Sequence, residues 1–133
     1  MSKLEHLSPE GLPHTPTYSQ VVVASGTRTI YVSGQVPVDG TGALVGAGDL
    51  GAQTTQAMRN LGLALAAAGA TFADLVKVTT YVVDYRPEHR AIIGKARGTF
   101  YADMTPPAST LIGVSALAAP EWLIEIEGVA VVD

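Results

Sequence analysis

The chain has 133 residues, of which 47% are apolar and only 15% are charged, and its formal net charge is −4. It contains none of the Lys/Arg clusters that neutralise phosphates, so we expect no nucleic-acid partner. The absence of cysteine excludes disulfides, thiolate metal sites and a cysteine nucleophile. A length of 133 residues suits a single domain that spans residues 1–133.

Two further features of composition bear on location and assembly. No segment approaches the roughly 18 apolar residues of a membrane span, and the N-terminal sequence lacks the apolar stretch of a signal peptide. We therefore expect a cytoplasmic protein without a membrane partner. The scarcity of charge suggests that some surface is buried against partner subunits, although an alanine-rich composition would also explain it.

The first third of the chain is rich in strand and turn signals. Residues 1–18 carry prolines and glycine, which favour an extended, irregular lead-in. Residues 19–24 and 29–36 are rich in β-branched and aromatic residues, and Ser25-Gly26-Thr27 between them predicts a tight turn and hence a hairpin. The run from Asp39 to Gly42 predicts a second reversal.

A long amphipathic helix follows. Asp49 is a suitable N-cap, and Gly69 offers a C-terminal stop. The predicted buried stripe contains Leu50, Thr54, Ala57, Met58, Leu61, Leu65 and Ala68. Gln53, Gln56 and Asn60 fall off that stripe, so we expect them to lie outside the core.

The remaining elements alternate strand and helix. Residues 75–83 have the period of two of a strand, and a second helix begins near Pro87 and ends before Pro106-Pro107. Gly94 and Gly98 weaken this helix, and their four-residue spacing suggests close backbone packing. Residues 109–117 and 122–132 are the last two predicted strands.

The order β-β-α-β-α-β-β predicts an α+β fold, a mixed sheet with two helices on one face. Two helices cannot cover both faces of such a sheet. Self-association would cover the other face.

Few residues outside the last strand point to chemistry. Glu125 and Glu127 lie on one face of that strand, about 7 Å apart. A desolvated carboxylate would suit general acid or base catalysis. The structural alternative is that both carboxylates are solvated or paired with arginines at a subunit contact. The three histidines are too scattered for a metal site, and no glycine motif for a phosphate-bearing cofactor is present. We predict neither a metal nor a cofactor.

Five segments of this chain resemble the RidA family, also called YjgF-like proteins. They are Tyr18-Ser19-Gln20, Tyr31 to Pro37, Asp74 to Val78 with Tyr81, Pro107-Ala108, and Ile124 to Glu127. The resemblance implies a chorismate-mutase-like fold, a homotrimer, and clefts between subunits that bind small metabolites. Active members hydrolyse enamines and imines to ketoacids and ammonia.

The resemblance also implies site residues. Glu125 matches the glutamate that activates water, and Tyr18, Ser33 and Gly34 match other pocket positions of the family. Leu111 takes a place that cysteine often holds in relatives. Ser109 stands where active members have the arginine that grips the substrate carboxylate. A serine hydroxyl offers one neutral donor in place of a charged two-pronged fork, so 2-imino acid deamination is expected to be weak or absent.

Two classes of function remain open. In the first, the chain is a hydrolase of imine, enamine or related carbonyl metabolites, in which Ser109 and Thr110 donate hydrogen bonds and Glu125 guides water. Arg86 or Arg97 could then restore the missing charge. In the second, the trimer is a non-catalytic metabolite-binding or protein-interaction module. The ribonuclease activity reported for some relatives fits poorly with the acidic charge balance.

Overall fold

A computed structural model of the chain describes residues 3–133 and confirms the α+β fold. The helices are α1 (Leu50–Ala67) and α2 (His89–Gly98), and a short 3-10 turn, η1 (Phe72–Asp74), precedes the fourth strand. The strands are β1 (Lys3–Leu7), β2 (Val21–Ser25), β3 (Arg28–Gln35), β4 (Leu75–Val83), β5 (Ala108–Val114) and β6 (Ile124–Val132). Neither helix in residues 3–133 is long and apolar enough to cross a membrane.

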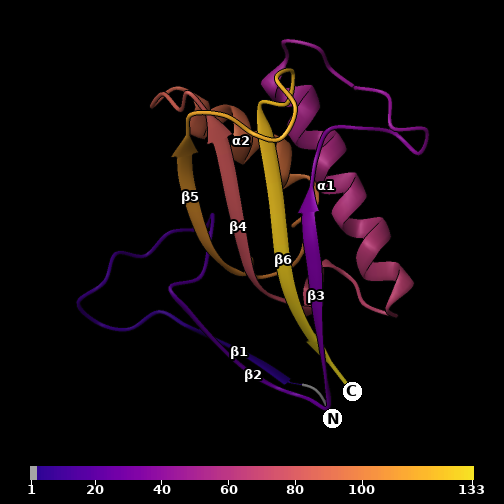
Figure 1. The fold of residues 1–133 in the computed structure, drawn as a ribbon. Coiled ribbons are helices and arrows are strands. Elements are labelled where there is room, and N and C mark those ends of the chain that lie inside the picture. The colour runs from indigo at the N-terminus through magenta and orange to yellow at the C-terminus, as the bar shows by residue number, and fades with distance from the viewer. Residues whose placement is uncertain (1–2) are drawn as a thin grey trace.

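The main sheet is mixed, as predicted. Its strand order is β3-β6-β4-β5, in which β4 and β5 run parallel and the other neighbours run antiparallel. Both helices lie behind this sheet in Figure 1, on the same face. Met58, Leu61 and Leu65 of α1 are fully buried against it, opposite Val78 and Ile126 of the sheet.

The predicted hairpin of residues 19–24 and 29–36 is wrong. The strand β2 pairs with β1, and β3 pairs with β6. The chain changes direction at Gly26, where an added Cβ would lie 2.7 Å from Val131 Cγ1 and 2.8 Å from the Val132 carbonyl oxygen. Thr27 then donates its backbone N–H to that same oxygen, at 3.1 Å, which directs β3 onto β6.

The lead-in was expected to be extended and irregular, and one part of it is a regular strand. Residues 3–7 form β1, so an additional strand precedes the predicted order. The paired β1 and β2 make a separate two-stranded arm below the main sheet in Figure 1. The segment between them follows an irregular path, as the proline content predicted.

The predicted ends of α1 are confirmed, but two of its polar side chains are not where we expected them. Asp49 accepts the backbone N–H of Ala52 at 3.0 Å, and Gly69 has a φ of +76° just beyond the helix. Gln53 and Gln56 were expected outside the core, yet both are buried. Gln53 donates to the carbonyl oxygens of Gly46 and Glu121, each at 3.1 Å.

The glycines of α2 do not serve close backbone packing, which corrects another expectation. A Cβ added at Gly94 or Gly98 would meet no atom within 4 Å. Both residues border a cavity instead.

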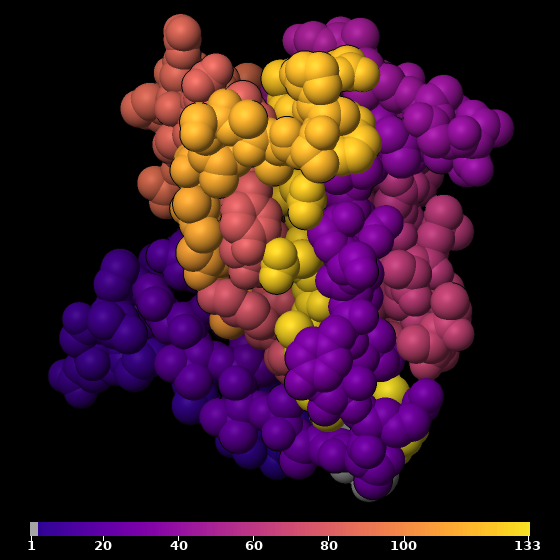
Figure 2. Space-filling view, in the orientation of Figure 1, coloured from indigo at the N-terminus to yellow at the C-terminus, as the bar shows by residue number. Residues whose placement is uncertain are grey.

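The face of the sheet that lies opposite the helices is open in the single chain. In Figure 2 the side chains of β3, β4, β5 and β6 form the surface turned to the viewer, with no helix in front of them. Tyr31 on this face is 79% exposed, and Ile112 is 39% exposed. The uncovered face predicted from the sequence is therefore present.

Candidate functional site

The two carboxylates of β6 lie on the open face of the sheet, as predicted. β4 and β6 pair Tyr81 with Glu125 and Thr79 with Glu127, so these four side chains share one face. The Tyr81 hydroxyl forms a hydrogen bond with Glu127, and this bond raises the pKa of Tyr81. Among residues 3–133, Glu125 has no hydrogen-bond donor bound to its carboxylate. The carboxylate oxygens of Glu125 are therefore not occupied by any donor from the described residues.

Gly34 makes room for Glu125. The pairing of β3 with β6 shifts register between Val32 and Gln35, so Ser33 and Gly34 form a bulge opposite a single residue of β6. A Cβ at Gly34 would overlap with the carboxylate of Glu125. The exposed Ser33 lies in the same bulge. The sequence resemblance grouped these three residues, and the fold brings them together.

The β5 residues divide between the two faces of the sheet. Thr110 pairs with Thr79 and accepts a hydrogen bond from Lys77 Nζ at 2.6 Å, so it belongs to the open face. Ser109 pairs with the buried Val78, and its side chain therefore lies on the helix side. Within one chain, Ser109 and Glu125 are on opposite faces of the same sheet.

Ser109, Leu111 and Tyr18 line a cavity of about 820 Å³ between the lead-in, β5 and α2, which we call the α2 hollow. The lead-in is fixed there by Ser19, whose backbone N–H donates to the Pro107 carbonyl oxygen at 3.0 Å. The Ser19 hydroxyl also donates to the Pro106 carbonyl oxygen, at 2.6 Å. This attachment holds the lead-in against the start of β5.

The α2 hollow also contains Arg97, one of the two arginines that the sequence left open. Arg97 is 8% exposed, and its Nη1 donates to Thr80 Oγ1 at 2.9 Å. Thr80 pairs with Leu111 in the β4–β5 ladder, which places the guanidinium beside the β5 side of the hollow. Helix periodicity alone does not tell which strand α2 covers. The sequence therefore could not show which of the two arginines, Arg86 or Arg97, lies beside β5.

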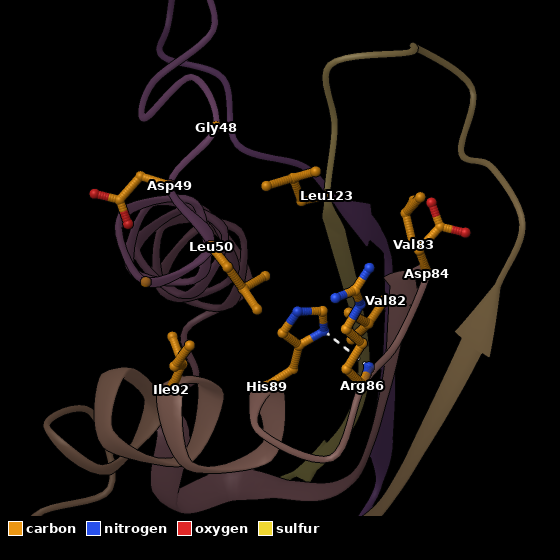
Figure 3. Close-up of a pocket in the computed structure, with 11 residues that line it drawn as sticks. Gly48, Asp49, Leu50, Val82, Val83, Asp84, Arg86, His89, Ile92 and Leu123 are labelled. Carbon is orange, nitrogen blue, oxygen red and sulfur yellow. Dashed lines mark hydrogen bonds between the residues drawn. The ribbon is translucent and has the colours of Figure 1, made fainter.

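Arg86 lies elsewhere. It lines a second cavity, of about 700 Å³, together with Asp49 at the start of α1 and His89 at the start of α2. Figure 3 shows this cavity, where the backbone N–H of Arg86 donates to His89 Nδ1 at 3.1 Å. Apart from Arg86, none of the residues that the sequence predicted for the site is among the described residues that line this cavity.

The candidate site has the Glu125 carboxylate on one face of the sheet and the α2 hollow with Arg97 on the other. No group of three or more His, Asp or Glu side chains in residues 3–133 is placed to hold a metal ion. The polar groups that the described residues bring to the two faces include a carboxylate, hydroxyls and a guanidinium.

Known proteins resemble this chain over most of its length. YyfB of Yersinia pestis, a crystal structure of the conserved Rid protein family, superposes with a TM-score of 0.92 at 44% identity and covers 96% of this chain and 98% of its own. The 2-iminobutanoate/2-iminopropanoate deaminase of Rattus norvegicus is 35% identical over 114 residues, 86% of this chain and 79% of the rat protein. Protein DfrA of Myxococcus xanthus is 32% identical over 114 residues, 86% of this chain and 84% of its own length.

The family model described as Endoribonuclease L-PSP matches residues 11–132. This match covers the described site residues from Tyr18 to Glu127. Together with the two relatives and the superposed fold, it shows that the chain belongs to the YjgF/RidA family.

Proposed function

We propose that this chain is a cytoplasmic, homotrimeric hydrolase of C–N bonds in imine, enamine or related carbonyl metabolites, which it binds in clefts between protomers. The observation that carries the proposal is Glu125, a carboxylate on the open sheet face that no hydrogen-bond donor among residues 3–133 occupies. A homologue at 35% identity is named 2-iminobutanoate/2-iminopropanoate deaminase, which supports C–N hydrolysis as the reaction class.

The positions of the site residues on the two faces of the sheet support an assembly of several protomers. Ser109 and Glu125 cannot face one ligand within a single chain, because one lies on the helix side and the other on the open side. A second protomer packed against the open face would bring its own α2 hollow to Glu125. This arrangement would also bury the exposed Tyr31.

Each site residue has a role in the proposed reaction. Glu125 accepts a proton from a water while the water oxygen adds to the carbon of the C=N bond. The π bond of C=N breaks as the same proton passes to the nitrogen, which gives a carbinolamine. Glu125 then moves the proton of the carbinolamine hydroxyl to the nitrogen, the C–N bond breaks, and the products are a carbonyl compound and ammonia or an amine. Ser109 and Thr110 donate hydrogen bonds to the substrate. Tyr18 and Leu111 form walls of the cleft, and the Ser33-Gly34 bulge holds the chain clear of Glu125.

Ser109 sets the expected substrate range. An arginine at this position would bind a carboxylate with two charge-assisted hydrogen bonds, and each such bond is roughly twice as strong as a neutral one. The loss of these two charge-assisted hydrogen bonds weakens carboxylate binding by at least about 2–3 kcal/mol, which is a factor of about 100 in affinity. We therefore expect weak deamination of 2-iminobutanoate and 2-iminopropanoate.

The test is ammonia release from 2-iminobutanoate and from a panel of imines, enamines and cyclic amides, with the rat deaminase as reference. The chain should be at least about 100-fold slower than the reference on 2-iminobutanoate and should turn over at least one member of the panel. Glu125→Gln should abolish that turnover. Glu127→Gln is the matched control on the same strand face, because Glu127 is held by Tyr81.

Three results would reject parts of the proposal. Reference-level rates on 2-iminobutanoate would reject the role given to Ser109. Turnover that survives Glu125→Gln would reject the base. Binding without turnover of any panel member would favour the non-catalytic metabolite-binding module.

A further inference from the structure

Arg97 is a buried cation without a counter-charge in the part of the chain that the structure describes. Its exposed fraction is 8%, and no carboxylate among residues 3–133 forms an ion pair with it. Its protein contacts are the hydrogen bond to Thr80 and the ring of Tyr101, whose centroid lies 5.9 Å from the guanidinium carbon. Buried charges in proteins are normally paired, because desolvation is costly.

Two polar atoms beside this guanidinium have no partner within residues 3–133. Arg97 Nε and the Tyr101 hydroxyl are both buried and make no hydrogen bond to this part of the chain. Both residues border a smaller cavity of about 150 Å³, and Arg97 also lines the α2 hollow. Unpaired buried donors are rare in folded proteins, and a bound molecule is one of their ordinary explanations.

The α2 hollow has the charge of an anion site. Arg90, Lys95 and Arg97 line it, and no aspartate or glutamate does. Arg90 and Arg97 are seven residues apart, two helical turns, so they lie on one face of α2. Gly94 lies between them and leaves the space open, since a Cβ there would meet no atom within 4 Å.

We propose that Arg97 holds the carboxylate of a small-molecule ligand in the α2 hollow, and that α2 thereby supplies the anchor that Ser109 does not. The inference rests on the proposed function, whose cleft it uses, and it names the substrate class of that cleft. The ligand is a carboxylic acid. Arg90 and Lys95 at the edge of the hollow attract it by long-range electrostatics.

The new anchor is displaced from the Ser109 position. Arg97 binds Thr80, which pairs with Leu111 and not with Ser109, so the anchor lies two residues further along β5, about 7 Å by the rise of a strand. In a 2-imino acid, the carboxylate is bonded directly to the reacting carbon. Such short substrates therefore remain poor ones, although their carboxylates are bound.

The experiment compares a carboxylate with its neutral isostere. Butanoate and butanamide are titrated into the wild-type protein and its variants, and binding is followed by chemical shifts of the backbone amides of β5 and α2. Butanoate should bind at least about tenfold more tightly than butanamide, as expected for a charge-assisted bond. The preference should weaken as salt is raised.

Arg97→Gln should remove the preference for butanoate and leave butanamide binding unchanged. Arg97→Lys should restore part of it. Arg86→Gln is the matched control, because Arg86 lines the other cavity, and it should keep the full preference. If Arg97→Gln fails to fold, the exposed pair Arg90→Gln with Lys95→Gln should still reduce the affinity for butanoate by about threefold or more.

Equal binding of butanoate and butanamide by the wild type would overturn the inference, as would a full preference in folded Arg97→Gln. A carboxylate of a neighbouring protomer on Arg97 would give the first of these results. The Glu125→Gln variant separates this inference from the proposed function. If Glu125→Gln loses turnover but keeps the preference for butanoate, the result supports both the proposed function and the carboxylate site. If the wild type shows the preference for butanoate but no turnover, the result supports the carboxylate site alone.

Discussion

The carboxylate of Glu125 lies over the backbone of Gly34, in the volume that the Cβ of any other residue would fill. Gly34→Ala should therefore displace Glu125 and lower kcat by about tenfold or more, since a misplacement of about 1 Å can cost 100-fold. Stability should change by less than about 1 kcal/mol, because the atoms in the way belong to a flexible side chain.

Turnover of the best panel substrate and thermal unfolding check this prediction. Gly40→Ala is the control, because a Cβ at Gly40 would meet no atom within 4 Å. Unchanged kcat in Gly34→Ala would show that the position of Glu125 does not limit the reaction.

Gln53 connects α1 to the segments that precede α1 and β6. Its amide nitrogen donates to the Gly46 and Glu121 carbonyl oxygens, and its Oε1 accepts the Leu123 N–H at 2.8 Å. Gln53→Leu leaves these buried groups unpaired. We therefore expect the free energy of unfolding, measured in urea, to fall by about 2–4 kcal/mol. Gln20→Leu, which removes one exposed hydrogen bond, should cost less than about 0.5 kcal/mol. Equal losses in the two variants would contradict this role.

Tyr101 carries a buried hydroxyl that has no hydrogen-bond partner among the described residues, 3–133. Removing an unpaired hydroxyl relieves a desolvation penalty, so Tyr101→Phe should be as stable as the wild type near pH 7, or more stable by up to about 1 kcal/mol. The ring that faces Arg97 is kept in this variant. A loss above about 1 kcal/mol would mean that the hydroxyl has a partner in the assembled protein.

The same variant has a pH signature. Burial raises the pKa of Tyr101, and the smaller effect of Arg97 lowers it. A group whose pKa is raised on folding contributes stability below its unfolded pKa, about 10 for tyrosine, and loses it as the pH rises through the folded pKa. The wild type should therefore lose more stability than Tyr101→Phe above about pH 10. Parallel stability profiles of the two proteins between pH 8 and pH 11 would exclude this titration.

Tyr31 tests the proposed assembly. It is 79% exposed on the open sheet face, where a neighbouring protomer would bury it. Tyr31→Asp places a charge in that contact, so the mass by sedimentation velocity should fall from three chains to one at low micromolar concentration. Leu63→Asp is the control, at a position on α1 that is 67% exposed. Trimers that persist in Tyr31→Asp would place the contact elsewhere.

The sequence predicted most of the fold, because both helices and the sheet strands have clear periodicity and clear ends. Asp49 and Gly69 bound α1 as expected, and Glu125 and Glu127 share a face. Strand pairing was harder. The turn at Gly26 is set by contacts with Val131 and Val132, more than 100 positions away in the chain, and local turn propensity does not contain that information.

The site was predicted unevenly for the same reason. Motif positions identified Ser33, Gly34 and Glu125, which the fold brings together. Gln53 was misplaced because a glutamine off the apolar stripe is ordinarily exposed. Its burial depends on the carbonyl groups of Gly46, in the loop before α1, and of Glu121, 68 positions away in the chain. Arg97 could not be chosen over Arg86 until the crossing of α2 over β4 was known.

The opposite orientation of Ser109 and Glu125 on one sheet has a genetic consequence. Suppose that each cleft combines the open sheet face of one protomer with the α2 hollow of its neighbour. Glu125→Gln then damages the first half of the cleft, and Arg97→Gln damages the second half. A heterotrimer that contains both kinds of chain then includes one cleft built from two undamaged halves. Complementation between two inactive alleles is thus a property that the two-sided sheet would confer.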